Sequence, residues 1–200
     1  MIKIVIAEDQ QMLCGALKAL LNLEDDLQVI GQAGNGEEAL AKIVALKPDV
    51  CLLDIEMPVL TGLDVAEEIK SHNTACKVII LTTFARPGYF ERAVKVGVNG
   101  YLLKDGPSDD LAVSIRQIMK GKDQFAPELV FGSLRDGNPL TNREQEVLRL
   151  VAAGKTIKEI SKQLYLSTGT LRNYMSEIIN KLEANNRITA IAIAEEKGWI

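Results

Sequence analysis

Short runs of apolar and β-branched residues alternate with segments of helical periodicity over the first 120 or so residues of the chain. Strands are expected at residues 3–7, 29–33, 50–53, 77–82 and 100–103. Several of these runs are apolar throughout, which is typical of strands buried on both faces. Helices are expected at residues 11–21, 37–46, 63–70, 89–96 and 108–120. Five strand-helix units in series predict an α/β fold with a doubly wound, five-stranded parallel sheet.

The pattern changes in the remainder of the chain. The stretch at residues 122–137 contains Pro127, Gly132 and Gly137 and is flanked by Gly121 and Pro139, and its apolar positions follow no sustained period, which predicts a linker. Beyond the linker the spacing is helical throughout, with helices expected at residues 141–153, 156–164, 168–182 and 187–197. A chain of 200 residues is also long enough for two cores. We therefore expect one domain at residues 1–121 and an all-α, four-helix domain at residues 138–200.

Charge and hydropathy restrict the classes of function. No apolar stretch approaches the ~20 residues needed to span a membrane, so we expect a soluble, cytoplasmic protein with no membrane partner. Residues 1–124 carry a net charge of −5, which disfavours nucleic-acid binding by the first domain. Residues 125–200 carry a net charge of only +1. Any DNA affinity of the second domain must therefore come from well-placed contacts or from pairing.

Polar side chains stand at the carboxyl ends of four predicted strands, the edge where open α/β sheets bind ligands. Glu8, Asp9 and Asp54 would offer Mg²⁺ the oxygen ligands that it prefers. Asp54 ends the central apolar strand and is the best candidate nucleophile toward phosphorus, giving an acyl phosphate. Lys104 could pair with phosphoryl oxygens and Thr82 could donate a hydroxyl hydrogen bond. Alternatively, each residue is polar only because the chain meets water at a strand end.

With the runs at residues 54–62 and 101–104, this set resembles the signature of two-component receiver domains over residues 1 to about 121. The resemblance implies a Mg²⁺ site with four contributors: the side chains of Asp9 and Asp54, the backbone carbonyl of Glu56 and, in support, Glu8. It also implies that Asp54 accepts a phosphoryl group from a sensor histidine kinase. Thr82 and Tyr101 would form the switch pair, the hydroxyl drawn to the phosphoryl group and the ring turning inward.

Two other classes of protein fit part of this chemistry. An aspartate-nucleophile phosphatase also uses Mg²⁺ and an acyl phosphate, but such enzymes carry the nucleophile after the first strand with a second acid two residues later. The adjacent Glu8 and Asp9 do not match that spacing, so we do not expect an enzyme. The second alternative is a DNA-binding protein whose first domain dimerises independently of phosphate.

The second domain contains two helices joined by a tight turn. Ile157, Ile160 and Leu164 form an apolar stripe on the first, and Ser167 is placed to cap the second. The outer face of the second helix carries small polar residues together with Arg172 and Asn173, which are types that read base edges in the major groove. A helical hairpin with an ordinary polar face fits these residues equally well.

The wider pattern resembles the LuxR/NarL/FixJ-type DNA-binding domain over residues 138–200, through the runs at 140–148, 158–160, 170–172 and 181–182. The resemblance implies contacts with double-stranded DNA from six residues: base readout by Arg172, Asn173 and Ser176, and phosphate contacts by Lys158, Thr170 and Lys181. It places the last helix at a dimer contact. The runs at 6–13 and 82–90 are similar to a subgroup of Gram-positive regulators that control membrane-lipid desaturation.

The first helix is more apolar than one core requires. Its apolar positions cover roughly 220° of the circumference, against the ~100° needed to face a single core. We therefore hypothesise that phosphorylated receivers form a homodimer through the helices at 11–21 and 108–120, which would bring two DNA-binding domains onto a two-fold operator. Alternatively, the linker covers the excess apolar surface.

Overall fold

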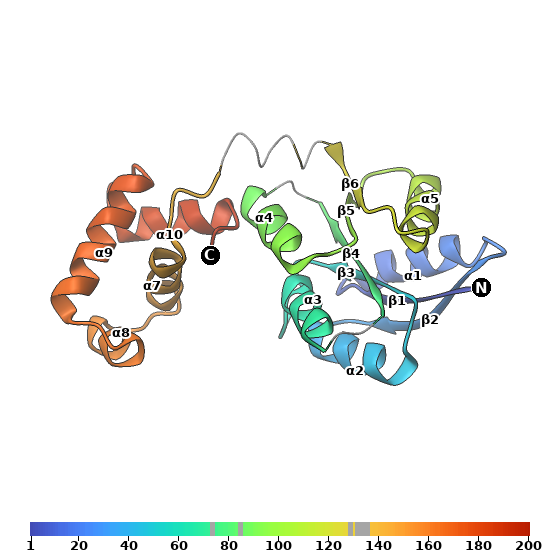
Figure 1. Ribbon diagram of the computed structural model, residues 1–200, viewed down its shortest axis with the longest axis horizontal. Helices are drawn as coiled ribbons and strands as arrows, with labels where there is room; N and C mark the ends of the chain where they lie inside the picture. The colour runs from blue at the N-terminus through green and yellow to red at the C-terminus, as the bar shows by residue number, and fades with distance from the viewer. Residues whose placement is uncertain (73–74, 84–85, 128–129, 131–136) are drawn as a thin grey trace. The chain divides into compact units, whose positions relative to one another are not determined.

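The computed structural model describes residues 1–72, 75–83, 86–127, 130 and 137–200 (Figure 1). They divide into two compact units, Met1–Ala85 with Phe90–Val130, and Arg86–Tyr89 with Phe131–Ile200. Part of the predicted linker, residues 128–129 and 131–136, lies outside the described residues. Among the described helices, none is both long enough and apolar enough to cross a membrane.

The first unit is built on a parallel sheet in the order β2-β1-β3-β4-β5-β6. Its strands are β1 (Ile2–Ala7), β2 (Leu27–Ala33), β3 (Val50–Asp54), β4 (Lys77–Thr82), β5 (Gly100–Leu103) and β6 (Gln124–Phe125). The five predicted strands and the doubly wound fold are confirmed. The sixth strand is a correction, because residues 124–125 were assigned to the linker. Two residues are too few to show a strand period, and they become a strand because the edge of β5 is open to pair with them.

Helices cover both faces of this sheet (Figure 1). They are α1 (Gln11–Leu21), α2 (Gly36–Leu46), α3 (Gly62–Ser71), α4 (Pro87–Val96) and α5 (Ser108–Met119). Cys14 and Leu21 of α1 and Ile115 of α5 pack in one buried cluster with sheet residues such as Leu52 and Ile79. Right-handed crossovers therefore bring α1 and α5, far apart in the sequence, side by side on the same face of the sheet.

The second unit contains the four predicted helices, α7 (Asn142–Ala152), α8 (Ile157–Leu164), α9 (Thr168–Lys181) and α10 (Arg187–Glu196). Side chains cap the start of each helix. Thr141 and Thr156 each form a capping box with the glutamate three residues later, and Ser167 accepts a hydrogen bond from the backbone of Thr170. Tyr165 ends α8 in the left-handed conformation and turns the chain into α9. The predicted helix-turn-helix and its Ser167 cap are confirmed.

Candidate functional site

Three carboxylates meet at the carboxyl edge of the sheet. Glu8 and Asp9 follow β1, and Asp54 ends β3, which pairs directly with β1. One oxygen from each carboxyl group lies within 4.8 Å of the others, with Glu8 and Asp54 buried and Asp9 exposed. Three converging carboxylates with an exposed side are a donor set that suits a hard divalent cation. The geometry therefore fits the expected metal site.

Lys104 lies between two of these acids. Its Nζ is 2.8 Å from Oε2 of Glu8 and 2.9 Å from Oδ1 of Asp54, and its side chain is only 6% exposed. The backbone N–H of Lys104 donates to the carbonyl of Thr82, which ties the end of β5 to the end of β4. Sequence reasoning placed Lys104 near the acids, and the structure adds that it bridges the two buried ones.

Burial and charge act against each other at this cluster. Burial and the neighbouring charge of Asp54 raise the pKa of Glu8, although the hydrogen bond from Lys104 opposes this. Burial alone would lower the pKa of Lys104, but its hydrogen bonds to Glu8 and Asp54 raise that pKa above its ordinary value. The Lys104 ammonium thus stays charged and offsets part of the negative charge that would repel an incoming phosphate.

The expected switch residues lie beside the cluster. Thr82 is buried at the end of β4 and pairs with Leu103, the residue before Lys104. Tyr101 of β5 is fully buried, and its ring meets the ring of Phe90 of α4 edge-on at a centroid distance of 5.6 Å. The ring is therefore in an inward position, and its role as a switch stays a prediction.

Glu56 lies two residues beyond Asp54, with an exposed side chain, in the loop between β3 and α3. The backbone N–H of Gly62 donates to the carbonyl of Ile55 and closes this loop. Thr61 and Asp64 form a capping box that starts α3. The loop keeps the backbone of Glu56 at the same edge of the sheet as the acids, and a metal contact by its carbonyl stays a prediction.

Gly62 was not singled out from the sequence beyond its place in the run 54–62. A Cβ atom at this position would lie 2.0 Å from the backbone oxygen of Asp54. Only glycine allows α3 to begin this close to the strand that carries the candidate phosphoacceptor. The sequence shows a glycine eight residues after Asp54, but the contact that requires glycine at this position is visible only in the fold.

The predicted DNA-reading residues share the exposed side of α9. Arg172, Asn173 and Ser176 are exposed, whereas Leu171 and Ile178 of the same helix are buried in the core of the unit. The hydroxyl of Ser176 donates to the backbone carbonyl of Arg172. These three residues therefore share an exposed polar face of α9, and contact of this face with DNA stays a prediction.

The residues expected at phosphates have different surroundings. Lys158 on α8 and Thr170 at the start of α9 are exposed. Nζ of Lys181 lies 2.8 Å from both carboxylate oxygens of Glu144, a buried residue of α7 that the sequence indicated only as part of the run 140–148. Lys181 thus holds α9 against α7, so its positive charge is already partly neutralised within the unit.

Comparisons with known proteins match both units. The chain matches the response regulator receiver domain over residues 4–116 and bacterial regulatory proteins of the luxR family over residues 138–194. It is 66% identical, over the full length of both chains, to the transcriptional regulatory protein YvfU of Bacillus subtilis strain 168. It is 59% identical to DesR of the same strain, over 100% of this chain and 99% of that protein. A structure of the response regulator RcsB in complex with DNA is 26% identical, covers 98% of both chains and has a TM-score of 0.67.

Proposed function

The chain belongs to the two-component response regulators that join a receiver domain to a LuxR-type DNA-binding domain and regulate transcription, and on this premise we propose that phosphorylation of Asp54 controls its pairing on DNA. The observation that carries the proposal is the buried ion-pair cluster in which Lys104 bridges Glu8 and Asp54. The phosphoryl donor is a sensor histidine kinase, the partner that the family implies. The chain would meet both kinase and DNA in the cytoplasm.

Asp9, Asp54 and the backbone carbonyl of Glu56 would hold Mg²⁺, with Glu8 in support. The ion would supply charge that stabilises the phosphoryl oxygens during transfer. A carboxylate oxygen of Asp54 would attack the phosphorus of the kinase's phosphohistidine, so that the O–P bond of the acyl phosphate forms as the P–N bond breaks and the histidine side chain leaves as neutral imidazole after taking up a proton. Lys104 then pairs with a phosphoryl oxygen as a fixed positive charge.

Thr82 and Tyr101 would act as the switch pair. The Thr82 hydroxyl, at the same edge of the sheet as Asp54, donates a hydrogen bond to the phosphoryl group. The inward position of the Tyr101 ring supports this assignment, because the pocket that receives the ring is formed in the structure.

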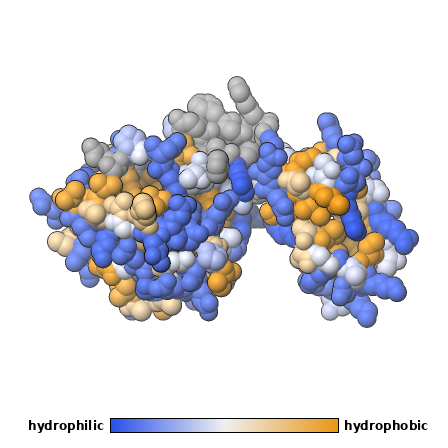
Figure 2. Space-filling model, turned by 180° about the vertical axis from the view of Figure 1, so that it is seen from behind, coloured by the Kyte–Doolittle hydropathy of each residue, from blue (hydrophilic) through white to orange (hydrophobic). Residues whose placement is uncertain are grey.

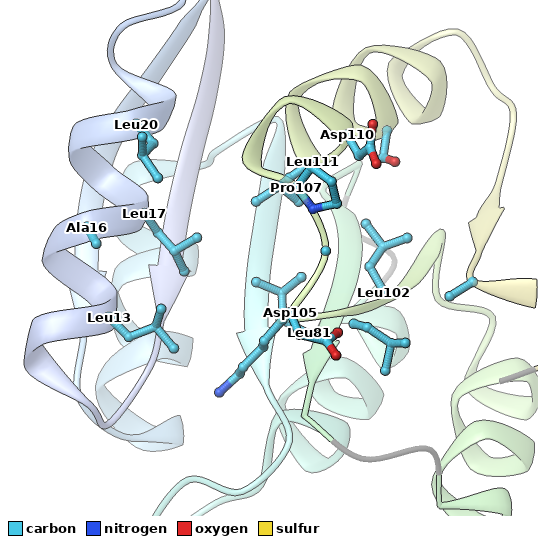
Figure 3. Close-up of a pocket in the computed structure, with 15 residues that line it drawn as sticks. Leu13, Ala16, Leu17, Leu20, Leu81, Leu102, Asp105, Pro107, Asp110 and Leu111 are labelled. Carbon is cyan, nitrogen blue, oxygen red and sulfur yellow. The ribbon is translucent and has the colours of Figure 1, made fainter. Parts of the chain in front are cut away.

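An apolar groove between α1 and α5 supports pairing through these helices. It has a volume of about 610 Å³ and reaches Leu81 and Leu102 of the sheet. In Figure 3, Leu13 and Leu17 of α1 face across it toward Leu111 of α5. Figure 2 shows hydrophobic residues gathered in patches on the surface of the protein.

The surface of α1 next to this groove is also apolar. Met12, which does not line the groove, is 90% exposed, and Leu20, which does, is still 43% exposed. Because α1 supplies both a wall of the groove and apolar residues beside it, the surface is suited to a second copy of the same chain related by a two-fold axis. Figure 1 shows that α1 and α5 lie on the same face of the sheet, so one partner could contact both helices.

Pairing would also explain how the second unit could bind DNA with so little net positive charge. A net charge of +1 over residues 125–200 gives one copy little general attraction for phosphate backbones. Two linked copies would add their contacts, with base readout by Arg172, Asn173 and Ser176 and phosphate contacts by Lys158, Thr170 and Lys181. The last helix, α10, would contribute a second dimer contact.

Sedimentation of the full chain at micromolar concentration tests the proposal. We expect a monomer without activator and a dimer with Mg²⁺ and beryllofluoride. Asp54→Asn should abolish the response. Leu13→Arg or Ala16→Arg should prevent dimer formation, whereas Val44→Arg, a matched change of an exposed apolar residue on α2, should not. A monomer under all conditions, or a dimer that ignores the α1 substitutions, would refute it.

The two alternatives give different results. If the first unit were a phosphatase, the chain would release phosphate from small phosphate esters with sustained turnover, and we expect none. If it dimerised independently of phosphate, Asp54→Asn would bind an operator fragment as tightly as the activated wild type. We expect the substituted chain to bind more weakly, as a single copy.

A further inference from the structure

A chain of three aromatic rings connects the candidate switch to the start of the segment that leads to the second unit. Phe90 of α4 packs edge-on against Tyr101 at 5.6 Å and against Phe125 at 5.9 Å. Tyr101 and Phe125 are partners in the register of β5 and β6. The three rings come from α4, β5 and β6, so they join elements that are separate in the sequence.

Strand β6 is held at both ends by residues next to the switch. The backbone N–H of Gln124 donates to the backbone carbonyl of Asn99, and that of Ala126 donates to the backbone carbonyl of Tyr101. The Asn99 side chain donates to a carboxylate oxygen of Asp123 at 3.1 Å. A strand of two residues is too short to be stable by itself, so its position depends on these hydrogen bonds and on the ring of Phe125.

The far end of β6 reaches the apolar groove. Ala126 is among the residues that line the groove between α1 and α5. A displacement of β6 would therefore change both the wall of the proposed pairing surface and the point from which the following segment leaves the sheet. Release of residues 122–126 would lengthen that segment by up to roughly 17 Å.

We propose that Phe125, through Phe90, is a positioning residue for the switch, and that β6 transmits the position of Tyr101 to the pairing groove and to the start of the linker. When the Tyr101 ring is inside, Phe90 is supported on both sides and β6 is held. When the ring turns outward, Phe90 loses one of its two edge-to-face contacts and β6 is released. This inference rests on the proposed phosphorylation of Asp54. It specifies how a change at the Asp54 edge of the sheet reaches the pairing groove and the linker.

Hydrogen exchange of the full chain, with and without Mg²⁺ and beryllofluoride, provides the test. The amides of Gln124 and Ala126 report β6 directly, since both donate hydrogen bonds to the sheet. In the wild type we expect activation to slow their exchange. Phe125→Ala should speed exchange roughly three- to tenfold, the effect of losing one edge-to-face aromatic contact, and should remove the response to activator.

Two controls separate positioning from a general loss of structure. Phe125→Tyr keeps the ring and should restore both the protection and the response. Gln124→Ala changes the neighbouring residue of β6, whose side chain donates to backbone oxygens of Lys122 and Asp123 within the described part of the chain, and should behave like the wild type. In sedimentation, Phe125→Ala should need more activator to form the dimer, and Phe125→Tyr should not.

The outcomes distinguish this inference from the proposed function. Mass spectrometry after treatment with acetyl phosphate shows whether Asp54 gains a phosphoryl group. If it does not, the proposed function is wrong. If Asp54 is phosphorylated but Phe125→Ala leaves both the exchange and the response of β6 unchanged, the inference about β6 alone is wrong.

Discussion

Replacing Gly62 by alanine tests how closely α3 must approach the strand that ends in Asp54. The new Cβ atom would lie 2.0 Å from the backbone oxygen of Asp54 and 3.3 Å from Cβ of Leu53. Because the closest contact is with main chain rather than with a flexible side chain, the loop or the strand must move. We expect a loss of about 3 kcal/mol in the free energy of unfolding, toward the upper end of what overpacking costs. For a unit of about 120 residues this lowers the melting temperature by roughly 12 °C.

Calorimetry and circular dichroism of the full chain would measure the shift. Trp199, the chain's single tryptophan, lies in the second unit, so its fluorescence follows that unit separately and should not change. Gly15→Ala is the matched control, because nothing lies within 4 Å of a Cβ atom there. In the interior of α1 the same substitution should stabilise the unit by about 0.5–1 kcal/mol.

The two substitutions should therefore shift the melting of the first unit in opposite directions. A Gly62→Ala chain that melts within about 2 °C of the wild type would refute the packing argument. We also expect Gly62→Ala to slow phosphorylation of Asp54, because the shift in main chain displaces the acceptor from Lys104. Gly15→Ala should leave the rate of phosphorylation unchanged.

Three further results are expected. Burial alone would raise the pKa of Glu144, but hydrogen bonds from Lys181 and Thr141 lower it below its ordinary value. The Glu144 carboxylate therefore stabilises the second unit above about pH 4.5, and this contribution is lost as the pH falls through the pKa of Glu144 in the folded state. Lys181→Met should flatten this acid dependence of unfolding, measured by tryptophan fluorescence. In operator-binding titrations, Arg172→Ala should relax sequence preference, whereas Lys158→Ala should weaken binding to all sequences and reduce the salt slope by about one. Chelation of divalent cations should block phosphorylation of Asp54 by acetyl phosphate, and added Mg²⁺ should restore it.

Much of the fold could be predicted because its signals are local. Continuous apolar runs predict β3 and β4, and helical periodicity predicts the helices of both units. Ser167, a capping residue, predicts the start of α9. The candidate site could be predicted for a related reason. In a parallel sheet all carboxyl ends meet at one edge, so Asp54 and Lys104 come together although fifty positions separate them.

Other features depend on contacts that no local pattern contains. Phe125 becomes part of a strand only because β5 has an open edge, and its ring acquires a role only because α4 places Phe90 beside it. Lys181 was expected at DNA phosphates because of the resemblance to LuxR-type DNA-binding domains. In the fold it faces Glu144, 37 positions away, and the pair joins two helices.

The sequence by itself determined that there are two units, which elements build them and which polar residues stand at the strand ends, because periodicity and residue chemistry along a short stretch are sufficient for those conclusions. The tertiary structure decided which residues from different elements contact one another. It placed Lys104 between Glu8 and Asp54, pressed Gly62 against the Asp54 backbone and linked Tyr101 to β6 through Phe90. Each of these depends on distances between elements, which are set by how helices and strands pack and not by their order along the chain.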